Sequence, residues 1–521
     1  DKGYLKDIYE QYPYGTSWEV YGVKLDGTTI SYSMKGTVGE GNVYIQPSFY
    51  TATFIADSAT YGSVSTESYM VLPGTTYSVN NNVLTLKYGA QDGRTVTAST
   101  KAVTGYTPKF TGWAPTSGTI NTATTIKAGF SGADVTAPYI TSLTSSTTSW
   151  TKENVILYAT AIDEGSGISY YQWSTNSNLT ASSSGWIGIT NTKSKINENN
   201  VVTTNGTYYF YAKDASGNVS KSSITVANID KTSPEITGFT AKESETIATY
   251  ATASITASDA GSGLASVVLE YGKSTKVGNT YQINYDKSIT SSYLVDGKGV
   301  NESRTKTITI TELEPESTYN IRITVKDVVG NTTTSTDYFK TKKAIAESGD
   351  IKYTSIQNAL NSIQESGTVK VLCSTTEDVA VTIEKTITLD FDNKEVIGVV
   401  RNAGILDVYN GKMKNELSTV GHSIENYGGT VTVYSGTYKG YYQGIYQPKI
   451  DGISEEGKVI IKGGNFEGGY DGVCICTGYL DIQDGHFVGV HSGAAAIDYA
   501  KGVNISGGSF YDTSTLYGGI V

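Results

Sequence analysis

The chain has 521 residues and a formal net charge of −11, and this length predicts about three to five domains. The acidic balance, without a basic stripe, argues against nucleic acid as a partner, and no apolar run approaches the roughly 18 residues needed to span a membrane. The 57 Gly, 40 Tyr, 9 Pro and 3 Cys exclude a proline-rich linker or a disulfide framework and favour all-β modules. Since the chain starts at Asp1 without Met and ends within a repeat, we expect a piece of a longer extracellular protein.

The first 133 residues predict two small β-modules. We expect residues 1–50 to be the end of one module. Residues 51–133 hold short strands and carry the segments TATFIADSATYGSVS, GYTPKFTGW and TTIKAGF in that order. This order resembles the internalin B-repeat family, which implies a compact β domain. We expect Trp113 to be a core anchor rather than a carbohydrate platform.

An internal duplication follows, over residues 134–230 and 231–343. Both copies open with Asp-x-Thr-x-Pro, carry Gly-Ser-Gly in the middle and close with Asp-x-x-Gly-Asn. The first two motifs recur after about 96 residues, the length of an immunoglobulin-type sandwich. The copies resemble tandem bacterial Ig-like domains, and the alternating run Leu313–Ile323 also resembles a fibronectin type III unit. We therefore predict two β-sandwiches.

Acidic residues in these repeated motifs support two interpretations. Asp214 and Asp327 each lie three residues before a glycine, in turns that a side-chain carboxylate can cap. Asp163, Asp214 and Asp230 are candidates for a calcium site near a module junction, because Ca²⁺ prefers oxygen ligands. Turn capping is the simpler hypothesis, since the sequence has no loop with the ligand density of an EF-hand. Calcium is the only cofactor that the sequence suggests.

Residues 344–366 predict one amphipathic helix. Ile356, Ala359, Leu360 and Ile363 follow helical spacing, and Thr354 or Ser355 provides a cap. A helix at this position is expected to cover the apolar end of the domain that follows.

Residues 344–521 as a whole predict a right-handed parallel β-helix that is cut off at its C-terminal end. Short alternating strands end in Gly-x-large apolar motifs, whose glycines are 25, 28, 21 and 23 residues apart, the length of one coil. We expect one interior ladder of apolar side chains, formed by Met413, Tyr438, Phe466, Phe487 and Phe510. The repeat resembles pectate-lyase-like β-helix proteins. Its opening, TVKVLCSTTEDVAVTIEKTITLDFDNKEVIG, resembles the first coils of such domains in Firmicute adhesin-like proteins.

Catalytic chemistry is weakly supported. The resemblance implies clustered Asp pairs, Gly-His-Gly and Arg-x-Lys for a hydrolase, and this sequence lacks them. Asp390 and Asp392 share one face of a predicted strand, and Asp407 and Asp481 occupy the same register of the repeat. A solvated face explains both pairs more simply than acid–base catalysis.

Two further groups of side chains lie in the predicted solenoid. Cys474 and Cys476 are expected to point inward as small apolar residues rather than to bind a metal. Candidate ligand-binding residues lie in or beside the connections between strands, where solenoids place their binding surfaces. They are Tyr441, Tyr442, Tyr446, Tyr470 and Tyr479.

Together these features predict a modular cell-surface adhesin or stalk protein of Gram-positive type, located on the cell surface or secreted. The expected partners are host or environmental glycans or proteins and the cell wall, and we do not expect an enzyme. The alternative is a secreted polysaccharide lyase or hydrolase whose catalytic coils lie outside this chain. A purely mechanical spacer is the third hypothesis.

Overall fold

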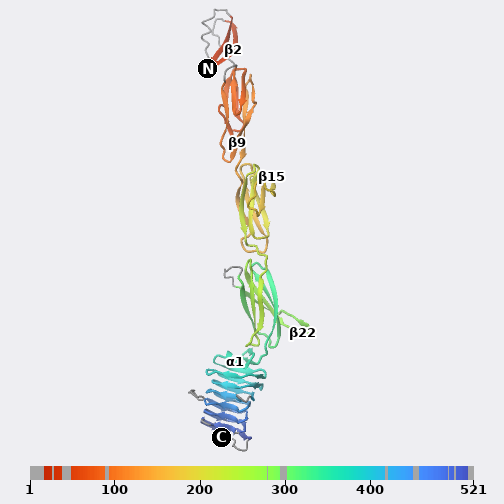
Figure 1. The fold of residues 1–521 in the computed structure, drawn as a ribbon, viewed down its shortest axis with the longest axis vertical. Coiled ribbons are helices and arrows are strands. Elements are labelled where there is room, and N and C mark those ends of the chain that lie inside the picture. Colours follow the sequence, from red (N-terminus) through yellow and green to blue (C-terminus); the bar gives the residue numbers. More distant parts are fainter. Residues whose placement is uncertain are drawn as a thin grey trace. The chain divides into compact units, whose positions relative to one another are not determined.

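The computed structural model describes two strands near the N-terminus and most of the chain from residue 49 onward. The described ranges are 17–25, 28–37, 49–88, 93–278, 280–293, 302–416, 421–449, 457–490, 492–497 and 500–513. The chain divides into two units, residues 1–149 with 153–229, and residues 150–152 with 230–521. No helix in these ranges is both long and apolar enough to cross a membrane. The elements are nearly all strands (Figure 1).

The first unit opens with an antiparallel pair, β1 (Ser17–Leu25) and β2 (Thr28–Thr37). The rest of the module expected over residues 1–50 lies largely outside the described residues. A two-sheet module follows, with strand orders β10-β6-β7-β8-β4 and β5-β3-β11-β9. Its strands are β3 (Tyr50–Ala56), β4 (Gly62–Val64), β5 (Ser68–Val71), β6 (Thr75–Asn80), β7 (Val83–Lys87), β8 (Thr95–Thr100), β9 (Tyr106–Ala114), β10 (Ser117–Ile120) and β11 (Thr124–Asp134). Trp113 is buried in its core, as predicted, with its ring edge-on to Phe54.

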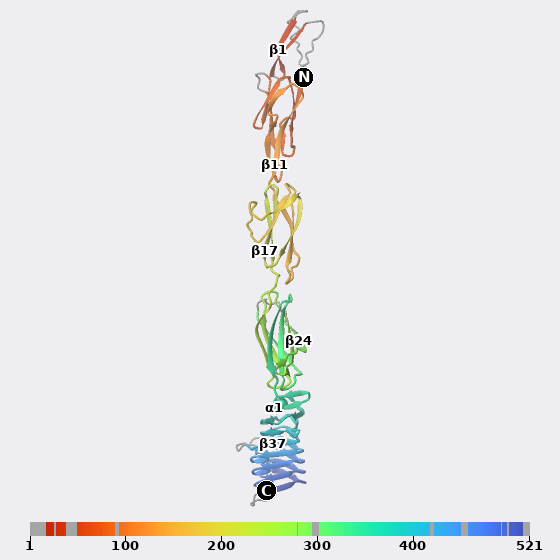
Figure 2. The same ribbon diagram turned by 90° about the vertical axis from the view of Figure 1, so that its right-hand side faces the viewer.

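The next module is a seven-stranded sandwich of three and four strands, ordered β12-β13-β16 and β15-β14-β17-β18. Its strands are β12 (Tyr139–Ser145), β13 (Val155–Ile162), β14 (Ile168–Ser174), β15 (Ile187–Lys193), β16 (Lys195–Val202), β17 (Gly206–Asp214) and β18 (Val219–Val226). Alternate residues of β13 are buried, as expected where one face of a sheet packs on its partner sheet. Figure 2 shows the sandwich around β17.

The second unit begins with a sandwich of the same strand order, β19-β20-β25 and β24-β21-β26-β27, which confirms the predicted duplication. Its strands are β19 (Glu235–Glu243), β20 (Ala251–Ser258), β21 (Leu264–Lys273), β24 (Lys287–Ser292), β25 (Arg304–Ile310), β26 (Thr318–Asp327) and β27 (Thr332–Lys340). A hairpin of β22 (Thr275–Val277) and β23 (Thr280–Gln282) is added to this copy. In both copies the fourth strand pairs with the third, unlike the four-plus-three arrangement of constant-type immunoglobulin domains.

A β-solenoid with three sheets follows, as the Gly-x-apolar repeat predicts (Figure 1), and its strands are parallel from β30 onward. The first sheet contains β28 (Ala346–Ser348), β29 (Ile351–Tyr353), β30 (Ser366–Val371), β33 (Thr386–Asp390), β36 (Ile405–Tyr409), β39 (Thr430–Val433), β42 (Lys458–Ile461), β45 (Gly478–Ile482) and β48 (Ala500–Ile505). The second contains β31 (Thr375–Thr376), β34 (Glu395–Ile397), β37 (Gly411–Asn415), β40 (Gly436–Gly440), β43 (Asn465–Gly468), β46 (His486–Gly489) and β49 (Ser509–Asp512). The third contains β32 (Val379–Val381), β35 (Val400–Asn402), β38 (His422–Asn426), β41 (Gln443–Gln447), β44 (Asp471–Ile475) and β47 (Ser492–Ile497).

The helix α1 (Ile356–Ser362) is shorter than the sequence predicts, because the antiparallel hairpin β28–β29 occupies the residues before it. The Ser355 hydroxyl caps the helix by accepting a hydrogen bond from the Asn358 amide, at 2.9 Å. Glu377 Oε1 accepts hydrogen bonds from the first two helical amides, at 2.6 and 3.2 Å. The apolar face of α1 packs into the solenoid core, as predicted for a cap.

The predicted interior ladder is confirmed. Met413, Tyr438, Phe466, Phe487 and Phe510 are aligned in successive coils. The rings of the four aromatic members are nearly parallel, with centroids of neighbours 4.9–5.2 Å apart, close to the spacing of hydrogen-bonded strands.

Glycine at the corner beside this ladder is required by the neighbouring coil. Gly436 has a φ of 124°, and a Cβ there would lie 2.4 Å from the backbone nitrogen of Gly411. A larger residue would therefore force two coils apart.

A second interior ladder was not anticipated from the sequence. Asn402, Asn426 and Gln447 are buried and are the last residues of three successive strands of the third sheet, β35, β38 and β41. Their side-chain amides bond from coil to coil, Asn402 Nδ2 to Asn426 Oδ1 at 2.9 Å and Asn426 Nδ2 to Gln447 Oε1 at 2.6 Å. This row satisfies polar groups that would otherwise be costly to bury.

Candidate functional site

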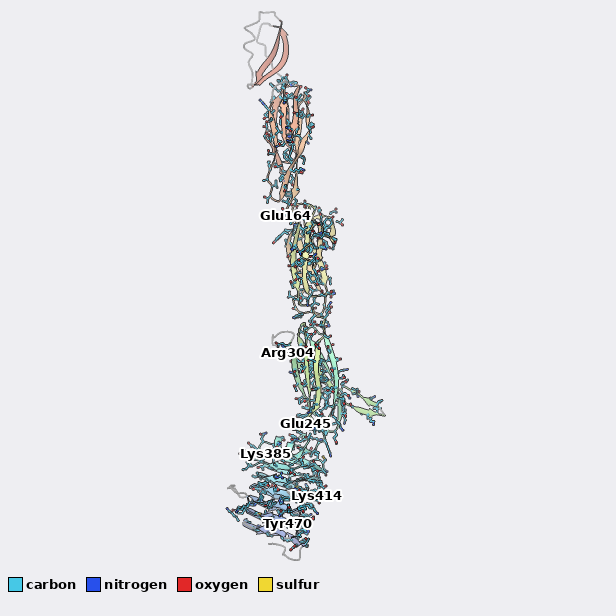
Figure 3. All side chains as sticks on the ribbon, viewed as in Figure 1. Glu164, Glu245, Arg304, Lys385, Lys414 and Tyr470 are labelled. Carbon is cyan, nitrogen blue, oxygen red and sulfur yellow. The ribbon has the colours of Figure 1, made fainter. Side chains whose placement is uncertain are left out.

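One corner of the solenoid gathers four of the five tyrosines that the sequence singles out. Tyr441 and Tyr442 fill the turn between β40 and β41, and Tyr470 lies in the equivalent turn between β43 and β44. The turns are stacked, because the Gly469 and Tyr470 amides donate to the carbonyls of Tyr441 and Tyr442 at 3.1 and 2.9 Å. Figure 3 labels Tyr470 among the coils of the solenoid.

His422, which begins β38 in the preceding coil, joins these tyrosines. Its ring stacks on Tyr446 with centroids 4.4 Å apart and lies 6.0 Å from that of Tyr442. The Tyr442 ring is 5.0 Å from Tyr441 and 5.4 Å from Tyr470. We call these five residues the aromatic corner. Tyr441 and Tyr470 are its exposed members, at 46% and 44%.

Two buried polar atoms at the aromatic corner are incompletely satisfied. His422 Nδ1 and Gln443 Oε1 are buried and have no hydrogen-bond partner. Gln443 Nε2 donates to Asp471 Oδ2 at 3.2 Å. Burial lowers the pKa of His422, and the charge of Glu425 and the side chain of Gln443 oppose that shift. Unmatched polar atoms of this kind are costly unless water or a ligand meets them.

Tyr479 does not belong to the aromatic corner. It lies on β45 in the first sheet, in register with Lys458 and Gly502. At 44% it is as exposed as Tyr470. Strand assignment separates these two residues, since Tyr479 lies on a strand and Tyr470 in a turn.

The two cysteines of β44 and the following turn differ from the prediction. Val473 and Ile475 point into the core, so Cys474 between them faces outward. The Sγ atoms of Cys474 and Cys476 are 3.9 Å apart, and neither cysteine forms a disulfide. Burial, with the neighbouring Cys476 thiol, raises the pKa of Tyr446 to about 12.

A shallow groove of about 570 Å³ runs along the glycine corner at the other end of the second-sheet strands. Successive coils contribute one polar side chain each to its floor, and these side chains form a column that the sequence pattern did not predict. The column is Lys412, Thr437, Asn465, His486 and Ser509. His486 Nδ1 lies 2.8 Å from the hydroxyl of Ser509.

The acidic residues considered for catalysis lie at a strand end, in the turn after it, and in one column of the first sheet. Asp390 ends β33, with Leu389 and Phe391 buried as expected, and its Oδ1 accepts from the Asp392 amide and from Asn410. Asp392 is not on the strand, because it adopts a φ of 45° in the following turn. Asp407 and Asp481 do share one column, with Thr432 and Ile460 between them.

The carboxylates considered for calcium form a trio at one end of the first sandwich, with one change of membership. Asp163 and Asp214 are joined by Asp134, the last residue of β11, and their oxygens lie within 4.8 Å of one another. All three side chains are buried. Asp214 also caps its turn as predicted, since its Oδ1 accepts from the Asn218 amide at 2.7 Å, and Asp163 Oδ1 accepts from the Gly167 amide at 2.6 Å.

Asp230, the third residue of the predicted set, belongs instead to an equivalent trio in the second sandwich, with Asp259 and Asp327. Asp230 and Asp134 occupy matching positions at the openings of the two copies, so the duplication explains the correction. The Ser262 amide donates to Asp230 Oδ2 at 2.6 Å, as the Ser166 amide does to Asp134 Oδ2 at 2.7 Å. Motif spacing shows that these residues recur, but not which recurrences meet in space.

Electrostatics within each trio are unfavourable. With oxygens no more than 4.8 Å apart and an effective dielectric constant of about 20, two ionised carboxylates repel each other by at least about 3 kcal/mol. Burial raises the pKa of Asp163, and the charges of Asp134 and Asp214 add to this effect. Burial likewise raises the pKa of Asp259, with the charges of Asp230 and Asp327 adding to it.

Comparison with known proteins gives no family assignment. No family model matches the chain, and no curated protein matches it. Solved structures that align with it include the FN1–FN3 domains of chicken CNTN1, with 12% identity over 55% of this chain and 95% of that one, and a TM-score of 0.18. The tetra-tandem repeat from the extending region of a large adhesion protein aligns at 15% identity over 58% and 76% of the two chains, with a TM-score of 0.20.

A segment of titin aligns at 12% identity over 55% of this chain and all of that one, with a TM-score of 0.25. With superpositions this limited, the module types rest on the strand orders given above. The chain is a modular β protein that joins two immunoglobulin- or fibronectin-III-like sandwiches to a parallel β-solenoid.

Proposed function

We propose that this protein is an extracellular adhesin of Gram-positive type, whose solenoid binds a neutral glycan at the aromatic corner. In this proposal the solenoid is a right-handed, pectate-lyase-like β-helix, and the internalin-like module and the sandwiches act as a stalk. The net charge of −11 disfavours polyanionic glycans.

The observation that carries the proposal is the gathering of exposed tyrosines beside two buried polar atoms, one each of His422 and Gln443. Tyr441 and Tyr470 present aromatic surface to solvent from stacked turns, and such rings suit the apolar faces of sugars. His422 Nδ1 and Gln443 Oε1, which are buried at the same corner, offer hydrogen-bonding capacity. Apolar surface with a few convergent polar groups is the usual composition of a ligand site.

Tyrosine substitution with a matched control tests this proposal. Binding of cellohexaose, an N-acetyllactosamine oligomer and polygalacturonate would be measured by calorimetry for the wild type, Tyr470→Ala and Tyr479→Ala. Losing one stacked ring is expected to weaken neutral-glycan binding about tenfold, equivalent to about 1.4 kcal/mol. Tyr479→Ala removes an equally exposed ring from a different sheet, so it should bind as the wild type does.

Each outcome separates the hypotheses. Equal loss in both variants would contradict a site at the aromatic corner, and absence of binding to all three probes would favour a mechanical spacer. Release of shortened sugars from polygalacturonate would instead support the lyase or hydrolase alternative. Loss of that release in Asp390→Asn would assign it to this chain.

A further inference from the structure

One carboxylate oxygen in the second sandwich is buried without any partner. Asp259 is 3% exposed, and its Oδ2 accepts hydrogen bonds from the amides of Gly261 and Gly263 at 3.2 and 2.7 Å. Its Oδ1 receives none. The carboxylates of Asp230 and Asp327 lie within 4.8 Å of the Asp259 carboxylate. The unsatisfied oxygen therefore belongs to a cluster of three acids.

No donor among the described residues reaches Asp259 Oδ1, and a buried acceptor without a donor is costly. The two neighbouring acids add repulsion to that cost. A positively charged ligand between the acids would satisfy Oδ1 and also remove the mutual repulsion of the trio.

We propose that Asp230, Asp259 and Asp327 bind a calcium ion, with Asp259 Oδ1 as a direct ligand. The donors are all carboxylate oxygens, which suit hard cations, whereas zinc sites draw on His and Cys. All three side chains are at most 3% exposed, leaving little room for the waters that Mg²⁺ keeps around it. Ca²⁺ accepts irregular sets of protein oxygens, so it fits this site better.

The site would connect three segments that are distant in sequence. Asp230 lies just before β19, Asp259 follows β20, and Asp327 is the last residue of β26. Bound calcium would hold the segment leading into β19 against two loops of the sandwich. This role is independent of glycan binding at the solenoid, so the two proposals can fail separately.

Calcium binding by the whole chain tests the proposal. After removal of metal with EDTA, the wild type, Asp259→Asn and Asp350→Asn would be titrated with CaCl₂ by calorimetry up to about 10 mM, because extracellular calcium modules bind with Kd values of about 0.1–1 mM. We expect Asp259→Asn to bind one calcium fewer per chain than the wild type. Asp350→Asn removes an exposed carboxylate from a turn of the solenoid, so it should bind as many ions as the wild type.

A second measurement does not depend on how well the variant folds. In the wild type, calcium should slow hydrogen exchange of the Gly261 and Gly263 amides, which donate to Asp259, and MgCl₂ at the same concentration should have less effect. Wild-type protein that binds no calcium would overturn the proposal. So would a correctly folded Asp259→Asn variant that binds as many ions as the wild type.

Discussion

Replacing Phe466 with alanine would measure what the interior ladder contributes to the solenoid. The Phe466 ring is 1% exposed and lies between those of Tyr438 and Phe487, at centroid distances of 5.2 and 5.1 Å. Truncating a buried Phe to Ala costs about 3–5 kcal/mol, because the surrounding structure closes the cavity only in part. Of this loss, each ring contact accounts for about 0.5–1.5 kcal/mol.

Tyr409→Ala is the matched control. The rings of Tyr409 and Tyr434 also stack in neighbouring coils, 4.2 Å apart and 9° from parallel, but both side chains are partly exposed. Losing that contact leaves no internal cavity, so we expect a cost of about 0.5–1.5 kcal/mol.

Hydrogen exchange of peptides from β40 and β43 is the suitable assay, because the several modules of this chain prevent a single two-state unfolding measurement. Equal losses in Phe466→Ala and Tyr409→Ala would refute the reasoning, since ring stacking rather than cavity formation would then set the stability.

Three further substitutions test separate features of the solenoid. Gly436→Ala should speed local hydrogen exchange more than Gly349→Ala does. Both glycines have positive φ, but a Cβ at Gly436 would meet the Gly411 backbone, whereas one at Gly349 would meet nothing. Equal effects would refute the steric argument. Burial lowers the pKa of His422, so wild-type stability should fall as pH drops below the ordinary value of about 6.5, and this component should be absent in His422→Gln. Glu377→Ala leaves two α1 amides without their acceptor and should cost about 0.5–2 kcal/mol, seen as faster exchange of those amides; unchanged exchange would contradict the capping role.

Sequence periodicity predicted those parts of the fold that depend on local repetition. The Gly-x-apolar motif identified the ladder of Met413, Tyr438 and Phe466 because each coil uses the same few residues to make the same corner. The extent of α1 could not be predicted in this way. Residues 346–353 form a hairpin that pairs with β30, and such a long-range contact leaves no helical or strand periodicity in so short a segment.

The candidate sites were only partly predictable for the same reason. The connections suggested the tyrosines, but His422 joins them from another coil through strand register. Cys474 was placed on the wrong face, because the orientation of a short strand depends on which neighbours reach the core. The repeated motifs identified the acidic residues, whereas the pairing of Asp134 with Asp163 rather than Asp230 depends on how the strands are connected in space.

The register of the solenoid also governs how quickly it can form. Ladder partners are separated by 21–28 residues, whereas Ala251 on β20 pairs with Ile310 on β25, far beyond it in sequence. Folding rates fall as contacts become more distant along the chain. The solenoid can therefore grow one coil at a time from the end covered by α1, each finished coil serving as the template for the next, while each sandwich must first close a long loop.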